Sequence, residues 1–130
     1  MEIELFNKKL LSLTKALNTL NEIIQKGIFS TIERDALIHR FEYTFEVFWK
    51  LAQVYLWEIH GLDYRSPKKV IRGLFQVNLL SENEVIRALE MVDDRKLSVH
   101  TYNETFAEEM SKKIPEYYAI MKEFIDNIND

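Results

Sequence analysis

Three side chains near residue 100 have the types and the spacing to act on a phosphate ester. Arg95, His100 and Tyr102 follow the pattern Arg-x4-His-x-Tyr. A histidine that titrates near neutrality moves protons to or from a 2′-hydroxyl or a leaving 5′-oxygen, and a permanently charged arginine stabilises the phosphate oxygens. The first two side chains therefore have the chemistry for metal-independent cleavage of RNA, with the 2′-hydroxyl as the nucleophile.

The spacing of Arg95 and His100 decides whether they can act together. On an unbroken helix, residues five apart lie about 140° apart around the axis, so the two would not share a face. Ser98 to Thr101 is the least periodic stretch here, and Thr101 and Asn103 are both suitable helix caps. We expect a helix break in this stretch, or a second subunit, to bring the pair together. In the structural alternative, Arg95 pairs with a neighbouring carboxylate and His100 caps a helix or is half-buried.

The composition predicts that long helices position these residues. Glycine and proline number only 3 and 2 among 130 residues, which leaves few positions for tight turns. No cysteine is present, which excludes disulfides, thiolate nucleophiles and cysteine-based zinc sites. The apolar fraction of 47% and the charged fraction of 29% are typical of a globular chain. We predict an all-α protein, an up-and-down four-helix bundle with one additional short helix, in a single domain over residues 1–130.

Capping and periodicity give the expected helix boundaries. Ser30 and Ser81 each precede a glutamate by three residues, which is the capping-box pattern, and Gly27 and Gly61 are placed to end the first two helices. Ser66 is expected to cap the short helix. Helices are expected over about 3–26 and 30–60, a short one from Pro67, one from Ser81 through Val92, and a last one over about 103–128. The inner face of the last helix is expected to consist of Phe106, Met110, Ile114, Tyr118, Met121 and Ile125. Aromatic residues concentrate in 30–60, beyond what a core of this size needs, so part of that surface is expected to form a dimer interface.

Charge argues against a protein that coats nucleic acid, because the formal net charge is −4. Local clusters remain, and Lys68, Lys69, Arg72 and Lys96 are candidates to guide an RNA backbone. A row of Glu42, Glu46 and Lys50 at steps of four predicts exposed ion pairs or, alternatively, the lining of a pocket that a partner recognises.

No resident cofactor or metal is expected. His39 and His60 have no carboxylate partner at a trusted ligand spacing and are interpreted as structural, and the sequence contains no glycine-rich phosphate loop. No apolar run is long enough for a membrane span, and the start of the chain is acidic. We therefore expect a cytoplasmic protein.

The chain resembles the HEPN superfamily of small helical bundles, and more closely its branch encoded beside minimal nucleotidyltransferases, often named "nucleotidyltransferase substrate binding protein". The resemblance covers about residues 5 to 125. It rests on the aromatic run 40–50, on the stretch Ser-Pro-Lys-Lys-Val-Ile-Arg over residues 66–72, and on Asp94-Arg95 followed by His100-Thr101-Tyr102.

The resemblance implies a homodimeric, metal-independent endoribonuclease that is the toxin of a toxin-antitoxin pair. It implies Arg95 and His100 as the catalytic pair, and a cognate minimal nucleotidyltransferase as antitoxin that transfers AMP to Tyr102. One departure is Lys96, because many HEPN ribonucleases have Asn, Asp or His at that position. The extra cation fits phosphate binding or a binding-only role. Two alternatives therefore stay open: a non-catalytic nucleotidyltransferase substrate-binding subunit, and a helical adaptor without an active site in which Tyr102 packs on the bundle end.

Overall fold

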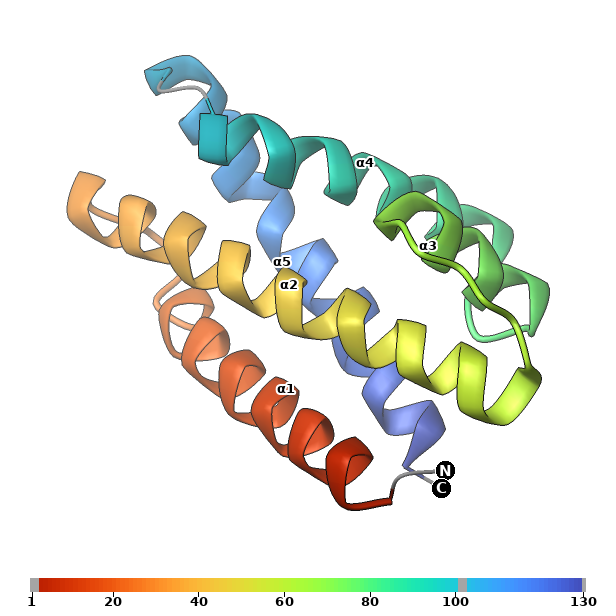
Figure 1. The fold of residues 1–130 in the computed structure, drawn as a ribbon. Helices are drawn as coiled ribbons and strands as arrows, with labels where there is room; N and C mark the ends of the chain where they lie inside the picture. The colour runs from red at the N-terminus through yellow and green to blue at the C-terminus, as the bar shows by residue number, and fades with distance from the viewer. Residues whose placement is uncertain (1–2, 101–102, 130) are drawn as a thin grey trace.

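The protein is described here by a computed structural model that covers residues 3–100 and 103–129, and every element in this part of the chain is helical. Five helices follow one another in the order α1 to α5 (Figure 1). The prediction of an all-α protein is confirmed. The helices span Ile3–Ile24 (α1), Thr31–His60 (α2), Pro67–Gln76 (α3), Glu82–His100 (α4) and Glu104–Ile128 (α5).

The helix ends follow the capping signals of the sequence. Ser30 and Glu33 form both bonds of a capping box at the start of α2, with N···O distances of 3.1 and 2.9 Å, and Ser81 and Glu84 do the same before α4. Gly61 ends α2 in the left-handed conformation, at φ 67°. At α3 the prediction is only partly right. Ser66 occupies the cap position before Pro67, but its side chain makes no capping hydrogen bond.

Helix α2 is the centre of the packing and contacts each of the other four helices, while α3 lies against α2 and α4 (Figure 1). The phenylalanines of α2, Phe41, Phe45 and Phe48, are at most 1% exposed. Their rings fill the core, so a dimer interface on α2 would be formed by other residues of the helix, and the homodimer stays a prediction. On α2, the exposed aromatic side chains are Tyr43 and Trp57. The other aromatic side chains of this helix are turned toward the neighbouring helices.

Helix α5 departs from its expected inner face at one position. Tyr117 is buried in the core at 1% exposure, whereas Tyr118 is only half-buried. All six expected inner residues lie in or against the core as predicted, Phe106 and Tyr118 being the two that are only partly buried. Among the described residues, no helix combines the length and the apolar character that crossing a membrane requires.

Candidate functional site

Arg95 and His100 lie on the same unbroken helix. Helix α4 continues to His100, so the helix break falls after the histidine and not between the two residues. The expectation of a break in Ser98–Thr101 that brings the pair together is therefore wrong within one chain. At 3.6 residues per turn, the two side chains leave α4 in directions about 140° apart.

The guanidinium of Arg95 is held by a carboxylate of α2. Its Nη2 atom lies 2.5 Å from Oε1 of Glu46, and the arginine side chain is 30% exposed. The Nε atom of Arg95 is buried and has no hydrogen-bond partner within the described chain. Glu46 also lies 3.4 Å from Nε1 of Trp49 and 3.8 Å from Nζ of Lys50. Arg95 thus makes the carboxylate pair that the structural alternative expects, while one of its donors stays unsatisfied.

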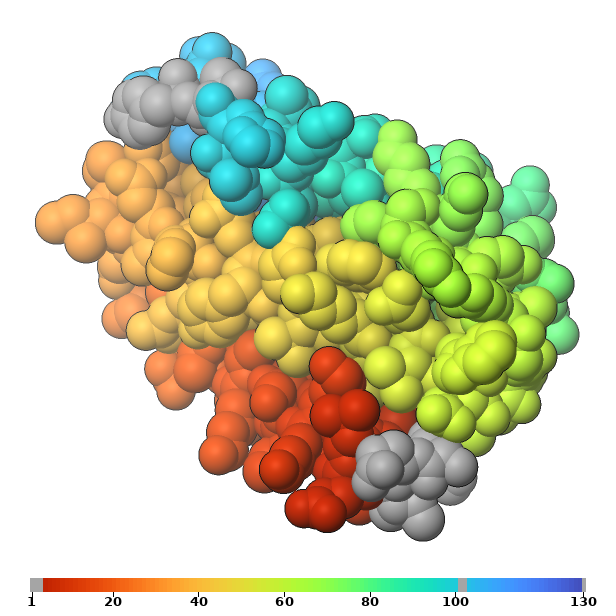
Figure 2. Space-filling model, viewed as in Figure 1, coloured from red at the N-terminus to blue at the C-terminus, as the bar shows by residue number. Residues whose placement is uncertain are grey.

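A second polar contact joins the same two helices one turn further on. The hydroxyl of Ser98 donates to Oε2 of Glu42 at 2.7 Å. Glu42 and Glu46 therefore face α4 and are only partly exposed, while Glu46 also makes the predicted i,i+4 pair with Lys50. We refer to Glu42, Glu46, Arg95 and Ser98 as the motif surface, and Figure 2 shows the end of α4 lying directly beside the first half of α2 there.

A small cavity of about 240 Å³ adjoins the motif surface, between α2 and the facing ends of α4 and α5. His39 lines it and is 78% exposed, with Nδ1 at 3.8 Å from Oε1 of Glu42, and its interpretation as a structural residue stays a prediction. The lining combines acceptor carboxylates with apolar side chains, a set suited to a ligand with hydroxyl or amino donors. It consists of Asp35, Ile38, His39, Glu42, Ser98, Asn103, Phe106 and Ala107.

His100 and Lys96 do not line this cavity. His100 is exposed as the last residue of α4, and Lys96 is exposed one turn earlier. Tyr102 and Thr101 lie outside the described residues, so the role of Tyr102 as an AMP acceptor stays a prediction. Asn103, the other expected cap, does begin α5, because its Oδ1 accepts from the N–H of Phe106 at 3.0 Å.

The predicted cations do not line one cavity. Lys68 turns to α4, where Nζ lies 2.8 Å from Oδ1 of Asp93. Lys69 and Arg72 line a separate cavity along α3, and Lys96 is not part of its lining. A role for these four residues in guiding RNA stays a prediction.

Behind the motif surface, α4 is fixed to α5 by a buried carboxylate that the sequence analysis missed. Asp94 is 5% exposed and accepts from the hydroxyl of Tyr117 at 2.5 Å and from Nζ of Lys113 at 2.7 Å. Burial, reinforced by the hydrogen bond to Asp94, raises the pKa of Tyr117 far above its ordinary value. Partial burial alone would lower the pKa of Lys113, but the hydrogen bonds that Lys113 donates to Asp94 and Glu90 outweigh it and raise that pKa.

One sequence signal points to this buried site. Val85, Ala88 and Met91 follow at steps of three along the inner face of α4, and the next step reaches Asp94. A carboxylate on an apolar face needs donors from the opposing helix. Lys113 and Tyr117, four residues apart on α5, supply them.

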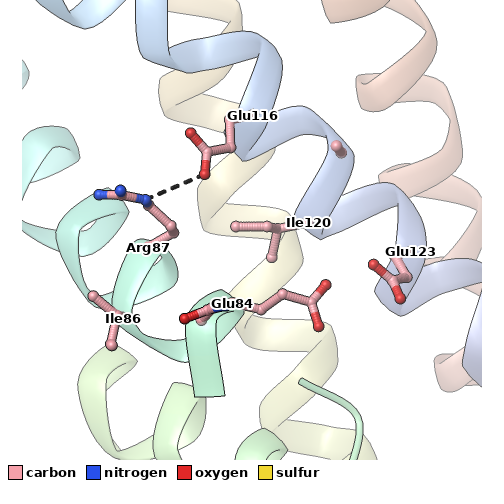
Figure 3. A pocket seen from close by; sticks show the side chains of 8 residues that line it. Glu84, Ile86, Arg87, Glu116, Ile120 and Glu123 are labelled. Atoms are coloured by element: carbon pink, nitrogen blue, oxygen red, sulfur yellow. Dashed lines mark ion pairs between the residues drawn. The ribbon is translucent and has the colours of Figure 1, made fainter. Parts of the chain in front are cut away.

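A wider cavity, of about 610 Å³, lies between α4 and α5 and contains no predicted site residue (Figure 3). Arg87 of α4 and Glu116 of α5 pair across it at 3.3 Å. Glu84 and Glu123 project from the two facing helices, and hydrogen bonding between them raises the pKa of Glu123 and lowers that of Glu84. No group of three or more histidine, aspartate or glutamate side chains suited to a metal occurs within residues 3–100 and 103–129.

Comparisons with known proteins identify one family and two similar structures. A family model described as "Nucleotidyltransferase substrate binding protein like" matches residues 8–130. A crystal structure of a protein from Thermus thermophilus matches with a TM-score of 0.87 and 47% identity, over 91% of this chain and 99% of that one. A Haemophilus influenzae structure, described as revealing the fold of a substrate binding domain of a nucleotidyltransferase, matches with a TM-score of 0.66 and 14% identity, over 99% of this chain and 100% of that one. The second match shows the fold alone. No curated protein matches the sequence.

Proposed function

We propose that this chain, which belongs to the family of nucleotidyltransferase substrate binding proteins, is a non-catalytic subunit that binds a nucleotidyltransferase and presents the substrate to it. The catalytic apparatus for nucleotide transfer is then supplied by the partner, because the sequence contains no glycine-rich phosphate loop and no nucleotidyltransferase motif. Under this proposal the chain binds a partner and does not cleave RNA.

One observation carries the choice: the Arg95 guanidinium is paired with Glu46, and His100 leaves α4 in another direction. General acid–base cleavage of RNA needs the imidazole and the guanidinium around one phosphate. A single chain does not provide that arrangement. A binding surface has no such requirement, because its charged and polar groups act on the partner and not on one reacting bond.

The motif surface and its adjoining cavity are the region assigned to this binding. Glu42 and Glu46 give the surface carboxylates that are 20% and 31% exposed, and the Arg95 side chain, which is 30% exposed, adds a cation. Polar groups in a partly dry setting contribute more to recognition than fully exposed ones. Binding of a partner at this position also covers the exposed end of α4.

The test is a calorimetric titration of the purified chain with the minimal nucleotidyltransferase of the same organism. Wild type is expected to form a saturable complex, and Arg95→Gln to weaken it by about tenfold, the effect of one partly desolvated charge-assisted contact. Lys8→Gln is the matched control, because Lys8 is an exposed cation on α1 and far from α4 in sequence. Absence of a complex with wild type, or an equal effect of both variants, contradicts the proposal.

A second candidate is the homodimeric HEPN ribonuclease, with Arg95 and His100 as catalytic residues and Tyr102 as the residue that the antitoxin modifies. One observation favours it: Leu97 and Val99 are 48% and 49% exposed immediately before His100. Apolar side chains at this position suit a second copy of the chain, which would bring the histidine of one protomer to the arginine of the other.

Cleavage of total RNA in EDTA separates the two candidates. The ribonuclease predicts cleavage by a dimer that leaves 2′,3′-cyclic phosphate ends and is lost in Arg95→Gln and in His100→Gln. The binding subunit predicts no cleavage by any of the three proteins, together with an intact complex with the nucleotidyltransferase for His100→Gln.

A further inference from the structure

An arginine without a role in the site described so far is buried near the start of α2. Arg34 lies in the first turn of this helix, and its side chain is 3% exposed. It belongs to the inner face of α2, because steps of three and four lead from it to Leu37 and Phe41. A guanidinium on an apolar face needs acceptors from an opposing helix. The partners of Arg34 therefore show which helix it holds.

Three carboxylates surround this guanidinium, and two of them belong to α5. Nη1 of Arg34 donates to Oε2 of Glu104 and to Oε1 of Glu108, both at 2.8 Å. Its Nε and Nη2 donate to Oδ1 of Asp35 at 3.1 and 2.9 Å. We refer to these four residues as the Arg34 cluster. One cation holds three anions here, so removal of the arginine would leave three carboxylates that repel one another across the two helices.

The Arg34 cluster joins two helices that line the cavity of about 240 Å³ beside the motif surface, which we call the motif cavity. On α2, Asp35 belongs both to the cluster and to the lining of this cavity. On α5, Phe106 and Ala107 line the cavity from the turn between Glu104 and Glu108. The ion pairs of Arg34 therefore hold the α5 wall of the motif cavity against its α2 wall.

Apolar packing contributes little at this end of α5. Phe106 is only half-buried, and Ala107, at 9% exposure, offers a single methyl group. Met110 is the first residue of α5 that is fully buried. Segments with few buried apolar contacts open at a low cost in free energy. The position of the first two turns of α5 therefore depends strongly on the Arg34 cluster.

We propose that Arg34 is a positioning residue, which holds the first two turns of α5 on α2 and so keeps the motif cavity in the shape that the partner recognises. The inference rests on the proposed function, which assigns partner binding to the motif surface and this cavity. Arg34 is too deeply buried to contact the partner and acts through Glu104 and Glu108. The planar guanidinium suits this role, because it binds several carboxylates in fixed directions.

The first measurement is hydrogen–deuterium exchange of the full chain, followed by mass spectrometry, for wild type and Arg34→Gln. The backbone amides of 107–112 are expected to exchange about tenfold faster in the variant, because the remaining carboxylates push the start of α5 away from α2. The amides of 117–125, in the core, are expected to change by a smaller factor. Arg40→Gln is the matched control, because Arg40 also lies on α2 but donates to the backbone carbonyl of Thr19 on α1 at 2.6 Å. It is expected to leave exchange of 107–112 unchanged.

The second measurement is calorimetry of the complex with the nucleotidyltransferase, at a temperature where all variants are folded. Arg34→Gln is expected to bind the partner about tenfold more weakly than wild type, and Arg40→Gln to bind as wild type does. Adding Glu104→Gln and Glu108→Gln to Arg34→Gln removes two of the repelling carboxylates, so about threefold of the lost affinity should return. A loss caused only by missing side-chain volume would not be recovered in this way.

Unchanged exchange of 107–112 in Arg34→Gln, an equal effect of Arg40→Gln, or no recovery in the triple variant would overturn the inference. Faster exchange with undiminished affinity would overturn it as well, because the start of α5 would then not matter for recognition. A wild-type chain that forms no complex contradicts the proposed function, whereas the exchange measurement still decides whether Arg34 holds α5. If Arg34→Gln does not fold, Glu104→Gln/Glu108→Gln replaces it, since these side chains are 59% and 58% exposed, and the same direction of change is expected.

Discussion

Two neighbouring residues of α4, Asp94 and Arg95, face different helices and differ in burial and in the number of satisfied hydrogen-bonding groups. Asp94 faces α5, is 5% exposed, and accepts hydrogen bonds from Tyr117 and Lys113. Arg95 faces α2, is 30% exposed, pairs with Glu46, and leaves its Nε without a partner within the described chain. A satisfied buried network fixes a helix, while an incompletely satisfied and partly exposed one can still gain from a ligand. We therefore infer that the side of α4 that faces α5 stabilises the fold, and that the side that faces α2 serves recognition.

The largest effect is expected from Asp94→Asn. The substitution keeps the size of the side chain but removes the negative charge that Tyr117 and Lys113 share, and it leaves both donors with a weaker acceptor. We expect the free energy of unfolding to fall by about 2 kcal/mol, less than the roughly 3–5 kcal/mol for breaking a fully buried pair, because Lys113 is 35% exposed. Urea denaturation of wild type and variant measures this change in the free energy of unfolding. Asp93→Asn, at an exposed residue paired with Lys68, is the control and should change stability by less than about 0.5 kcal/mol. Equal effects would contradict the assignment.

Tyr117→Phe should have the next largest effect. It removes the hydroxyl that donates to Asp94 and keeps the ring, whose centroid is 5.7 Å from that of Phe41. A loss of about 1 kcal/mol is expected for one buried hydrogen bond. The double variant with Asp94→Asn should fall short of the sum by about 1 kcal/mol, since both changes remove the same interaction. Strict additivity would show that the two side chains do not act as a unit.

Arg95→Gln sharpens the other side of the comparison. Its ion pair with Glu46 is partly exposed, so the free energy of unfolding should fall by only about 0.5 kcal/mol. The complex with the nucleotidyltransferase should nevertheless weaken by about tenfold, as proposed above. Thermal denaturation and calorimetry on the same sample give both values. A loss of stability as large as that of Asp94→Asn would place Arg95 among the structural residues.

The smallest effect is expected at Glu90, on the rim of the buried network. Hydrogen bonding from Lys113, and from Arg87 to a lesser extent, lowers its pKa below the ordinary 4.5. The unfolded chain then binds the proton more tightly, so the stabilisation is present above about pH 4.5 and is lost as the pH falls through the folded-state pKa. Glu90→Gln should flatten this acid decline and reduce stability at pH 7 by a few tenths of a kcal/mol. Denaturation at about pH 7, 5 and 3.5 tests it, and an unchanged decline would contradict it.

Local patterns predicted the helices well because their ends are decided within a few residues. The boxes at Ser30 and Ser81 and the left-handed Gly61 are local hydrogen-bonding and conformational features. Ser66 shows the limit of this reasoning. It occupies the cap position of α3, but a suitable residue type does not guarantee that its side chain makes the bond.

The site was less predictable because spacing along the chain does not give the direction in which a side chain finds its partner. Glu42 and Glu46 lie on the polar side of α2, and only the docking of α4 converts them from an exposed row into partners of Ser98 and Arg95. In the same way, the rotation of α5 about its axis decides that Tyr117, and not Tyr118, enters the core.

The sequence by itself determined the helical class, the positions of most helix ends, and the presence of an arginine and a histidine five residues apart, because backbone hydrogen bonding and apolar periodicity act over short distances. Only the tertiary structure decided that α4 continues to His100, that Asp94 is the buried anchor, and that Arg95 is held by Glu46. The physical reason is that these outcomes depend on desolvation and on donors from other helices, and both arise only when the helices pack.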